Sequence, residues 1–109
     1  MSKNHLGEFE EMIMLTIAIL NNDVYALAII EEMEERLQRK VSIGSLQTVL
    51  RRLEKKGYLS SRFGEATKER GGKRKRHFSL TAYGKEALAQ AKEQRIGLWN
   101  AIPELSLNN

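Results

Sequence analysis

Apolar residues recur every three or four positions in the first part of the chain, and this spacing predicts two amphipathic helices. The first spans about residues 7–20, with apolar positions at Phe9, Met12, Ile13, Ile17 and Leu20. The polar run 21–23 interrupts it, and Asp23 is expected to cap a second helix over about residues 24–38. The apolar positions of that second helix are Leu27, Ile30, Met33 and Leu37.

A third helix is predicted over about residues 43–56, between the capping residue Ser42 and the helix-ending Gly57. Apolar residues gather on one side of it, at Leu46, Val49, Leu50 and Leu53. The opposite side is centred on Gly44, Thr48, Arg51 and Lys55, with Ser45, Gln47 and Arg52 at its edges. One face is therefore suited to a core, and the other to cationic and hydrogen-bonding contacts.

The periodicity then changes from helical to extended. Residues 58–63 and 77–80 are predicted to be strands of an antiparallel hairpin, joined by the glycine-marked, charge-rich segment 64–76. Thr81 is the natural cap of a final helix over about residues 82–101, which Pro103 ends. The predicted fold class is therefore mostly α (α+β): a winged helix-turn-helix with three helices, a two-stranded β wing and a further C-terminal helix.

The last helix carries an apolar seam of three- and four-residue spacing, which is typical of a helix that pairs with another chain. The seam comprises Leu88, Ala91, Arg95, Leu98 and Ile102, widened by Ile96 and Trp99. We therefore expect a homodimer. We expect the chain to divide into the winged helix-turn-helix domain at residues 1–81 and a dimerisation helix with a short tail at residues 82–109.

Positive charge is concentrated in the middle of the chain. Residues 41–77 hold eleven of the 18 Lys and Arg residues and three of the 14 Asp and Glu residues, although the net charge is only +4. Such a concentration favours a polyanionic partner, because Lys and Arg release the counterions condensed on a phosphate backbone. It coincides with the polar face of the third helix and with the hairpin, which favours double-stranded DNA as the partner.

Within this basic region, the residue types predict different contacts. Arg forms paired hydrogen bonds with guanine and Gln with adenine, so Gln47, Arg51 and Arg52 can read base edges. Phosphates suit the hydroxyl and lysine side chains, and the basic run 73–76 adds affinity without specificity. The candidate DNA-binding residues are Ser42, Gly44, Ser45, Gln47, Thr48, Arg51, Arg52, Lys55, Lys73, Arg74, Lys75 and Arg76.

Other classes of function have little support. The chain has no cysteine and two isolated histidines, so no metal site or other cofactor is expected. No nucleophile–base pattern or phosphate-binding loop suggests an enzyme. No stretch is long enough to span a bilayer, and the N-terminus is acidic where a signal peptide is basic, so a cytoplasmic location is expected.

Several motifs together resemble the PadR-type transcriptional regulators. They are the segments 41–46, 50–59, 71–78 and 80–84, with Leu6-Gly7-Glu8-Phe9-Glu10 and Val24-Tyr25-Ala26. The resemblance covers residues 6–99. It implies a dimeric winged-helix repressor that binds inverted-repeat operator DNA and is often released by a small molecule. The short subgroup that this chain resembles dimerises through its terminal helix and its N-terminal helix, which implies interface roles for Phe9 and Ile13.

The chain departs from that family pattern in two places. Gln47-Thr48 stand where many members have Tyr-Pro, which is expected to change affinity or operator choice. Lys75 stands where the wing often has Pro, which is expected to loosen its tip.

The sequence leaves two alternatives open, one for the role of Trp99 and one for the class of function. Trp99, with Met12 and Ile96, could line a cavity for a small aromatic effector, but an anchoring role for Trp99 in the dimer interface is favoured. The chain could also be a protein-interaction module or a nucleic-acid adaptor without operator specificity. That alternative is weaker, because the polar helix face and the basic hairpin fit DNA binding so well.

Overall fold

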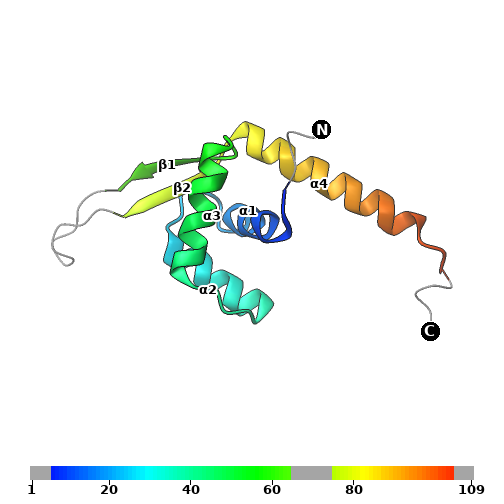
Figure 1. Cartoon of the computed structure of the whole chain (residues 1–109), viewed down its shortest axis with the longest axis horizontal. Helices are drawn as coiled ribbons and strands as arrows, with labels where there is room; N and C mark the ends of the chain where they lie inside the picture. The colour runs from blue at the N-terminus through cyan, green and yellow to red at the C-terminus, as the bar shows by residue number, and fades with distance from the viewer. Residues whose placement is uncertain (1–5, 65–74, 105–109) are drawn as a thin grey trace.

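The computed structural model describes residues 6–64 and 75–104. The elements are α1 (Glu8–Ile19), α2 (Ala26–Leu37), α3 (Ile43–Lys55), β1 (Leu59–Phe63), β2 (Arg76–Leu80) and α4 (Ala82–Ala101), as Figure 1 shows. This confirms the predicted order of three helices, a hairpin and a fourth helix. The hairpin and the free end of α4 lie at opposite ends of the molecule.

The turn between α1 and α2 has an unusual backbone. Asn21, Asn22 and Asp23 all adopt left-handed conformations, with φ of 68°, 66° and 56°. Asn and Asp tolerate this region better than other residues with a Cβ. The prediction that Asp23 caps α2 is wrong, because the N-cap residue is Tyr25 and makes no side-chain cap. The carboxylate of Asp23 accepts hydrogen bonds from Arg62 of β1 instead.

The face of α2 that packs on the core agrees with the predicted one only in part, since Met33 is buried and Ile30 packs partly buried against the core. Ile29 and Met33 are its buried residues, whereas Leu27 and Leu37 remain 45% and 44% exposed. Since α2 has apolar side chains around much of its circumference, the packing against α1 and α3 decides which of them is buried.

In α3, by contrast, the predicted apolar face is the buried one. Its core residues are Leu46, Val49, Leu50 and Leu53. Ser42 Oγ accepts a hydrogen bond from the Ser45 backbone N–H at 3.1 Å, which confirms the predicted cap. Gly57, with φ of 85°, turns the chain from α3 toward β1.

The hairpin is fixed to the rest of the fold at its base. β1 and β2 pair antiparallel, with Leu59 opposite Leu80. Val24 forms an isolated antiparallel bridge with Phe78, with two backbone hydrogen bonds of 3.0 and 2.7 Å. The side chain of Asn22 also accepts a hydrogen bond from the Leu80 N–H at 2.8 Å. The left-handed turn thus supplies a third extended segment beside β2.

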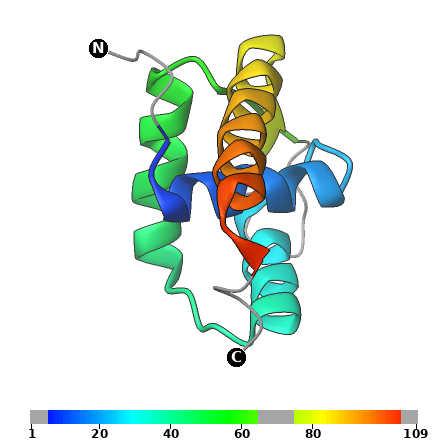
Figure 2. The same cartoon turned by 90° about the vertical axis from the view of Figure 1, so that its right-hand side faces the viewer.

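α4 begins in the core and then leaves it. Thr81 Oγ1 accepts the Gly84 N–H at 2.9 Å, which confirms the predicted cap, and Gly84 and Ala87 are the buried residues of this helix. From residue 92 onward every described residue of α4 is exposed. Figure 2 shows α4 crossing α1, and Figure 1 shows its second half extending beyond the body.

We expect Gly84→Ala to lower the free energy of unfolding by about 1–3 kcal/mol. A Cβ at residue 84 would overlap the carbonyl oxygen of Tyr58, so the start of α4 has to shift away from the core. Gly97→Ala on the same helix is the control, because its Cβ would meet no atom within 4 Å and alanine favours a helix by about 0.5–1 kcal/mol. Urea unfolding at one protein concentration measures the free energy of unfolding of both variants. A Gly84→Ala variant as stable as Gly97→Ala would contradict the close packing of α4 on Tyr58.

Candidate nucleic-acid interface

The outer face of α3 is exposed along its length. Gln47, Thr48, Arg51 and Lys55 all project from it, one or two per turn. At its N-terminal end, Ser42, Gly44 and Ser45 are also exposed. No atom lies within 4 Å of where a Cβ of Gly44 would be, so a ligand backbone can approach the helix closely here.

The cations on this face differ in what they already contact. In the described part of the chain, neither Arg51 nor Lys55 forms an ion pair. Thr48 Oγ1 donates to the Gly44 carbonyl at 3.0 Å, a bond within the helix that leaves the hydroxyl oxygen at the surface. As far as residues 6–64 and 75–104 are concerned, Arg51 and Lys55 can therefore neutralise an external anion.

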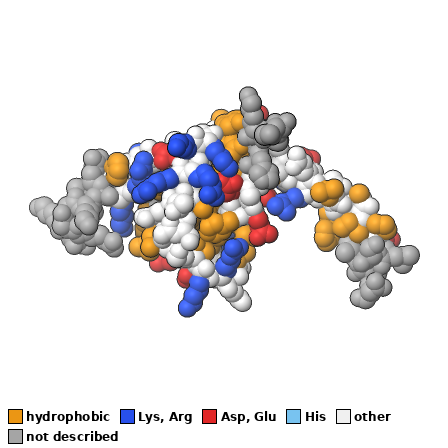
Figure 3. Space-filling view, in the orientation of Figure 1, with side chains coloured by type: hydrophobic (Ala, Val, Ile, Leu, Met, Phe, Trp, Pro, Cys, Tyr) orange, Lys and Arg blue, Asp and Glu red, His pale blue; other side chains and the backbone are white. Residues whose placement is uncertain are grey.

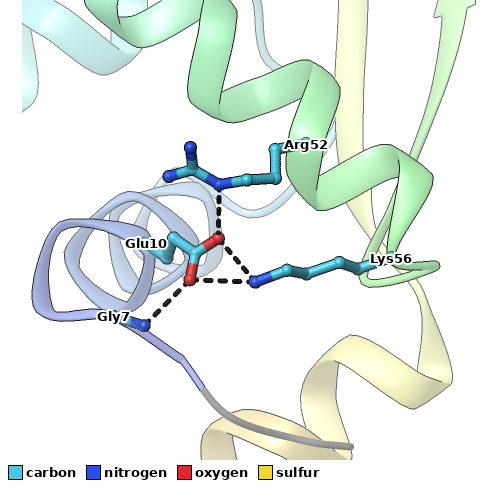
Figure 4. Close-up of polar contacts among 4 residues, drawn as sticks. All are labelled: Gly7, Glu10, Arg52 and Lys56. Atoms are coloured by element: carbon cyan, nitrogen blue, oxygen red, sulfur yellow. Dashed lines mark hydrogen bonds and ion pairs between the residues drawn. The ribbon is translucent and has the colours of Figure 1, made fainter.

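Arg52 has a different environment from its neighbour. Its Nε donates to Glu10 Oε2 at 2.9 Å, and Lys56 Nζ lies 2.9 Å from the same oxygen. Figure 4 shows both cations directed at Glu10, across from α3 to the first turn of α1. Arg52 is therefore directed toward α1 while its side chain stays half-exposed, and its contact with base edges stays a prediction.

The carboxylate of Glu10 is held in its charged form. Burial by itself raises the pKa of Glu10, since the residue is only 4% exposed. Hydrogen bonds from Lys56, from the Gly7 N–H and from Arg52 outweigh that effect and lower the pKa from 4.5 to about 2. The same carboxylate caps the start of α1 through a 2.8 Å bond from Gly7. Glu10 thus joins the N-terminus of α1 to the end of α3.

The described part of the basic run contributes two cations near α3. Lys75 Nζ lies 4.1 Å from the ring centre of Tyr25, and Arg76 Nε donates to Ser61 Oγ at 2.9 Å. Arg76 also lies 3.4 Å from Glu54 Oε1 on α3. Figure 3 shows Lys and Arg side chains gathered over α3 and the strands. Lys73 and Arg74 lie outside the described residues.

The predicted dimerisation residues are divided between the core and the surface. Leu98 and Trp99 are 74% and 62% exposed, and Ile96 and Ile102 are also exposed. Figure 3 shows hydrophobic side chains along this part of α4. Phe9, Leu88 and Ala91 are half-buried within one chain. Ile13 is fully buried in the core of the single chain, which corrects its assignment to the interface.

Arg95 is part of an ion pair within one chain. Its Nη2 lies 2.6 Å from Glu11 Oε1, and its Nε donates to both oxygens of that carboxylate at 3.0 and 3.1 Å. Glu11 is 8% exposed, and the contact with it raises the pKa of Arg95. The pair fixes α4 against α1.

The residues predicted for an effector pocket do not lie together in one chain. Ile96 and Trp99 line an open depression on α4 with Arg95, Leu98 and Ile102. Met12 lies elsewhere, packed partly against the core, with its sulfur accepting a hydrogen bond from Arg39 at 3.7 Å. In residues 6–64 and 75–104, no three His, Cys, Asp or Glu side chains gather to hold a metal ion. No described helix is long and apolar enough to cross a membrane.

Residues 14–90 match the model of the transcriptional regulator PadR-like family. The chain belongs to this family. PadR-like proteins are DNA-binding regulators and not enzymes, and the exposed polar face of α3 next to a β hairpin is consistent with this. A comparison with curated proteins gives no match.

Solved structures show the same fold. A PadR-like transcription factor from Bacteroides fragilis is 28% identical, with a TM-score of 0.73 over 84% of each chain. A PadR-like transcriptional regulator from Bacillus cereus is 19% identical, with a TM-score of 0.72 over 93% of each chain. F93 from STIV, a winged-helix DNA-binding protein, is 18% identical, with a TM-score of 0.64 over 82% of this chain and 88% of that one. The PadR-like chain therefore has a winged-helix fold.

Two groups of site residues were missed by sequence reasoning. Glu10 and Glu11 resemble ordinary acidic residues in the first turn of a helix, and nothing in the pattern indicates that they are buried. Tyr25, Leu27 and Ile43 border the basic face, but they come from two helices whose contact the sequence does not show.

We expect Glu10→Gln to lower the free energy of unfolding at pH 7 by about 1–3 kcal/mol, because a charged acceptor of hydrogen bonds from Gly7, Arg52 and Lys56 is lost. The folded-state pKa of about 2 is below the usual 4.5, so the stabilisation is present above pH 4.5 and is lost as pH falls toward 2. Urea unfolding between pH 7 and 2.5 measures this. The free energy of unfolding should fall with pH in the wild type, and the fall should be smaller in Glu10→Gln.

Glu8→Gln is the matched control, because Glu8 is exposed on the same first turn. The free energy of unfolding of Glu8→Gln should fall with pH as much as that of the wild type. The same pH dependence in wild type and Glu10→Gln would show that Glu10 is not charged and paired as described.

Proposed function

We propose that the protein is a repressor that binds inverted-repeat operator DNA as a homodimer. The observation that supports this most is the outer face of α3, where Gln47 and Arg51 are exposed and Arg51 has no acidic partner among the described residues. A helix of this kind, placed next to a hairpin, enters the major groove with its exposed side chains toward base edges.

The remaining residues of the face then have supporting roles. Thr48 and Lys55 contact phosphates, while Ser42, Gly44 and Ser45 let the backbone approach the start of α3. Arg76, Lys75 and the neighbouring Lys73 and Arg74 add salt-dependent affinity. We assign Arg52 a positioning role, because Glu10 holds it toward α1.

The second half of α4 supports the homodimer. Its exposed apolar surface is formed by Ile96, Leu98, Trp99 and Ile102. A single chain leaves this surface in water, although burying it would be favourable. A second copy of α4 covers it in a two-fold arrangement, with Phe9, Leu88 and Ala91 at the edge. Residues 82–109 thus serve dimerisation, and residues 1–81 bind DNA in the cytoplasm.

A small aromatic effector is compatible with that dimer. Ile96 and Trp99 already border a depression, and a second copy would enclose it. Trp99 then anchors the interface and lines the ligand space at once.

Selection of bound fragments from random double-stranded DNA, at near-physiological salt, tests the function. We expect an inverted repeat whose half-sites are about one helical turn apart. Binding without any enriched sequence, weakening steadily with salt, would overturn the repressor and favour a nucleic-acid adaptor without operator specificity.

On the selected DNA, we expect Arg51→Ala to weaken binding by roughly 1–3 kcal/mol and to affect random DNA far less. Arg36→Ala is the matched control, because Arg36 is exposed on α2 and pairs with Glu32. Fluorescence anisotropy measures the DNA affinity of both variants. If Arg51→Ala loses equal affinity for selected and for random DNA, Arg51 does not recognise bases.

We expect Leu98→Glu to give a monomer on a calibrated sizing column, because a charge in an apolar interface has no partner there. Leu37→Glu places the same charge on an exposed apolar position of α2, away from α4, and should remain a dimer. A Leu98→Glu variant that elutes with the wild type would exclude this part of α4 from the interface.

A further inference from the structure

The hairpin extends past the core on which it rests. Leu59, Phe78 and Leu80 are buried at its base, whereas Phe63 and Arg76, at the far ends of the strands, are exposed. Figure 1 shows the two strands reaching away from the helices. Because a two-stranded ribbon is only marginally stable by itself, contacts other than the core have to fix its outer part relative to α3.

On one face of the hairpin, Glu54 joins α3 to both strands. Its Oε2 accepts a hydrogen bond from Ser61 Oγ of β1 at 2.6 Å. Ser61 Oγ in turn accepts from Arg76 Nε of β2 at 2.9 Å, and Arg76 Nη2 lies 3.4 Å from Glu54 Oε1. The three side chains form a closed polar network with one member from each of α3, β1 and β2.

On the opposite face, Asp23 holds the same two strands from the turn between α1 and α2. Arg62 follows Ser61 and therefore points to the other side of the ribbon. Its Nε and Nη2 donate to the two carboxylate oxygens of Asp23 at 3.0 and 2.6 Å. This hydrogen bonding lowers the pKa of Asp23. His77, which pairs with Arg62, places its Nδ1 3.2 Å from the Asp23 carbonyl oxygen.

The two ion pairs matter more for orientation than for stability. All four side chains are exposed or half-exposed, and such pairs add little to the free energy of unfolding. They act, however, on opposite faces of the ribbon, at the end that the core does not hold. Contacts of a protein with phosphates set its register on the duplex, so the angle between hairpin and α3 decides where α3 meets the bases.

We propose that Asp23 and Glu54 are positioning residues for sequence-specific DNA binding, which fix the hairpin relative to α3 by holding Arg62 and Arg76 from its two faces. Neither carboxylate contacts DNA, whose phosphates would repel it. The effect on operator choice rests on the proposed function, whereas the fixing of the hairpin does not.

Amide hydrogen exchange without DNA tests the fixing of the hairpin. The Gly64 N–H donates to the Lys75 carbonyl at 2.7 Å, just beyond the ends of the strands. It should exchange roughly two- to fivefold faster in Asp23→Asn and in Glu54→Gln, the effect of losing an exposed ion pair. Amides in the middle of α3 report global unfolding and should keep their wild-type rates. Wild-type exchange of Gly64 in both variants would overturn the proposal.

The chain offers a matched control and a conservative replacement. Glu32→Gln removes the same charge from an exposed ion pair with Arg36 on α2, away from the hairpin, and should leave Gly64 unchanged. Asn fits the backbone at residue 23, because Asn21 and Asn22 already adopt the same left-handed conformation.

The ratio of affinities for selected and random DNA, measured by anisotropy, tests the effect on recognition. We expect Asp23→Asn and Glu54→Gln to lower this ratio roughly three- to tenfold and Glu32→Gln to leave it unchanged. Loss of negative charge alone strengthens binding to both DNAs equally. An unchanged ratio in both variants would therefore overturn the positioning role.

Double variants show whether each acid acts through its arginine. Glu54→Gln should lower the ratio no further in an Arg76→Gln background, nor Asp23→Asn in an Arg62→Gln background. Equal losses with and without the arginine would refute the mechanism. Failure of the proposed function is distinct, because DNA selection would then enrich no sequence while the faster exchange of Gly64 persisted.

Discussion

Two adjacent carboxylates of α1 hold the helices of this protein together. Glu10 accepts hydrogen bonds from Arg52 and Lys56 at the end of α3, and Glu11 pairs with Arg95 of α4. Both glutamates are buried, and a buried carboxylate without its cation is strongly destabilising. Moving α3 or α4 away from α1 would therefore leave a buried carboxylate without its cation. The position of the outer face of α3 depends on contacts made on its inner side.

The exposed apolar surface of the described residues includes two patches with different surroundings. One is the second half of α4, beyond the last turn that packs on the core. The other is the groove beside α3, where Leu27 and Ile43 lie next to cations. The surface on α4 comes from a single helix, whereas the groove combines apolar side chains with the cations Arg51, Lys75 and Arg76. The two patches thus differ in the chemistry of what can cover them.

The predictive power of the sequence was greatest where a single segment contains the whole pattern. α3 separates its apolar and polar residues cleanly and has Ser42 and Gly57 at its ends, so its limits and both faces were predictable. The limits of α4 were predicted for the same reason, from Thr81 and Pro103.

Apart from the cap of α2, the differences from the sequence-based expectations concern contacts between distant segments. The role of Arg52 depends on Glu10, 42 positions earlier, and a charge pattern does not show which partner a cation finds. Likewise, the orientation of α2 is decided by α1 and α3, because its own residues permit more than one buried face. The groove was not foreseen, since α2, α3 and β2 each contribute only a part of it.

The adjacency of Glu10 and Glu11 bears on the spacing of the two half-sites in the proposed operator. Side chains of consecutive helical residues diverge by about 100°, so these two glutamates fix the angle between α3 and α4 at one point of α1. In a dimer joined through α4, that angle sets how far apart the two copies of α3 lie. In the proposed dimer, the number of base pairs between half-sites would then depend on a helix whose two carboxylates face the other helices of the same chain.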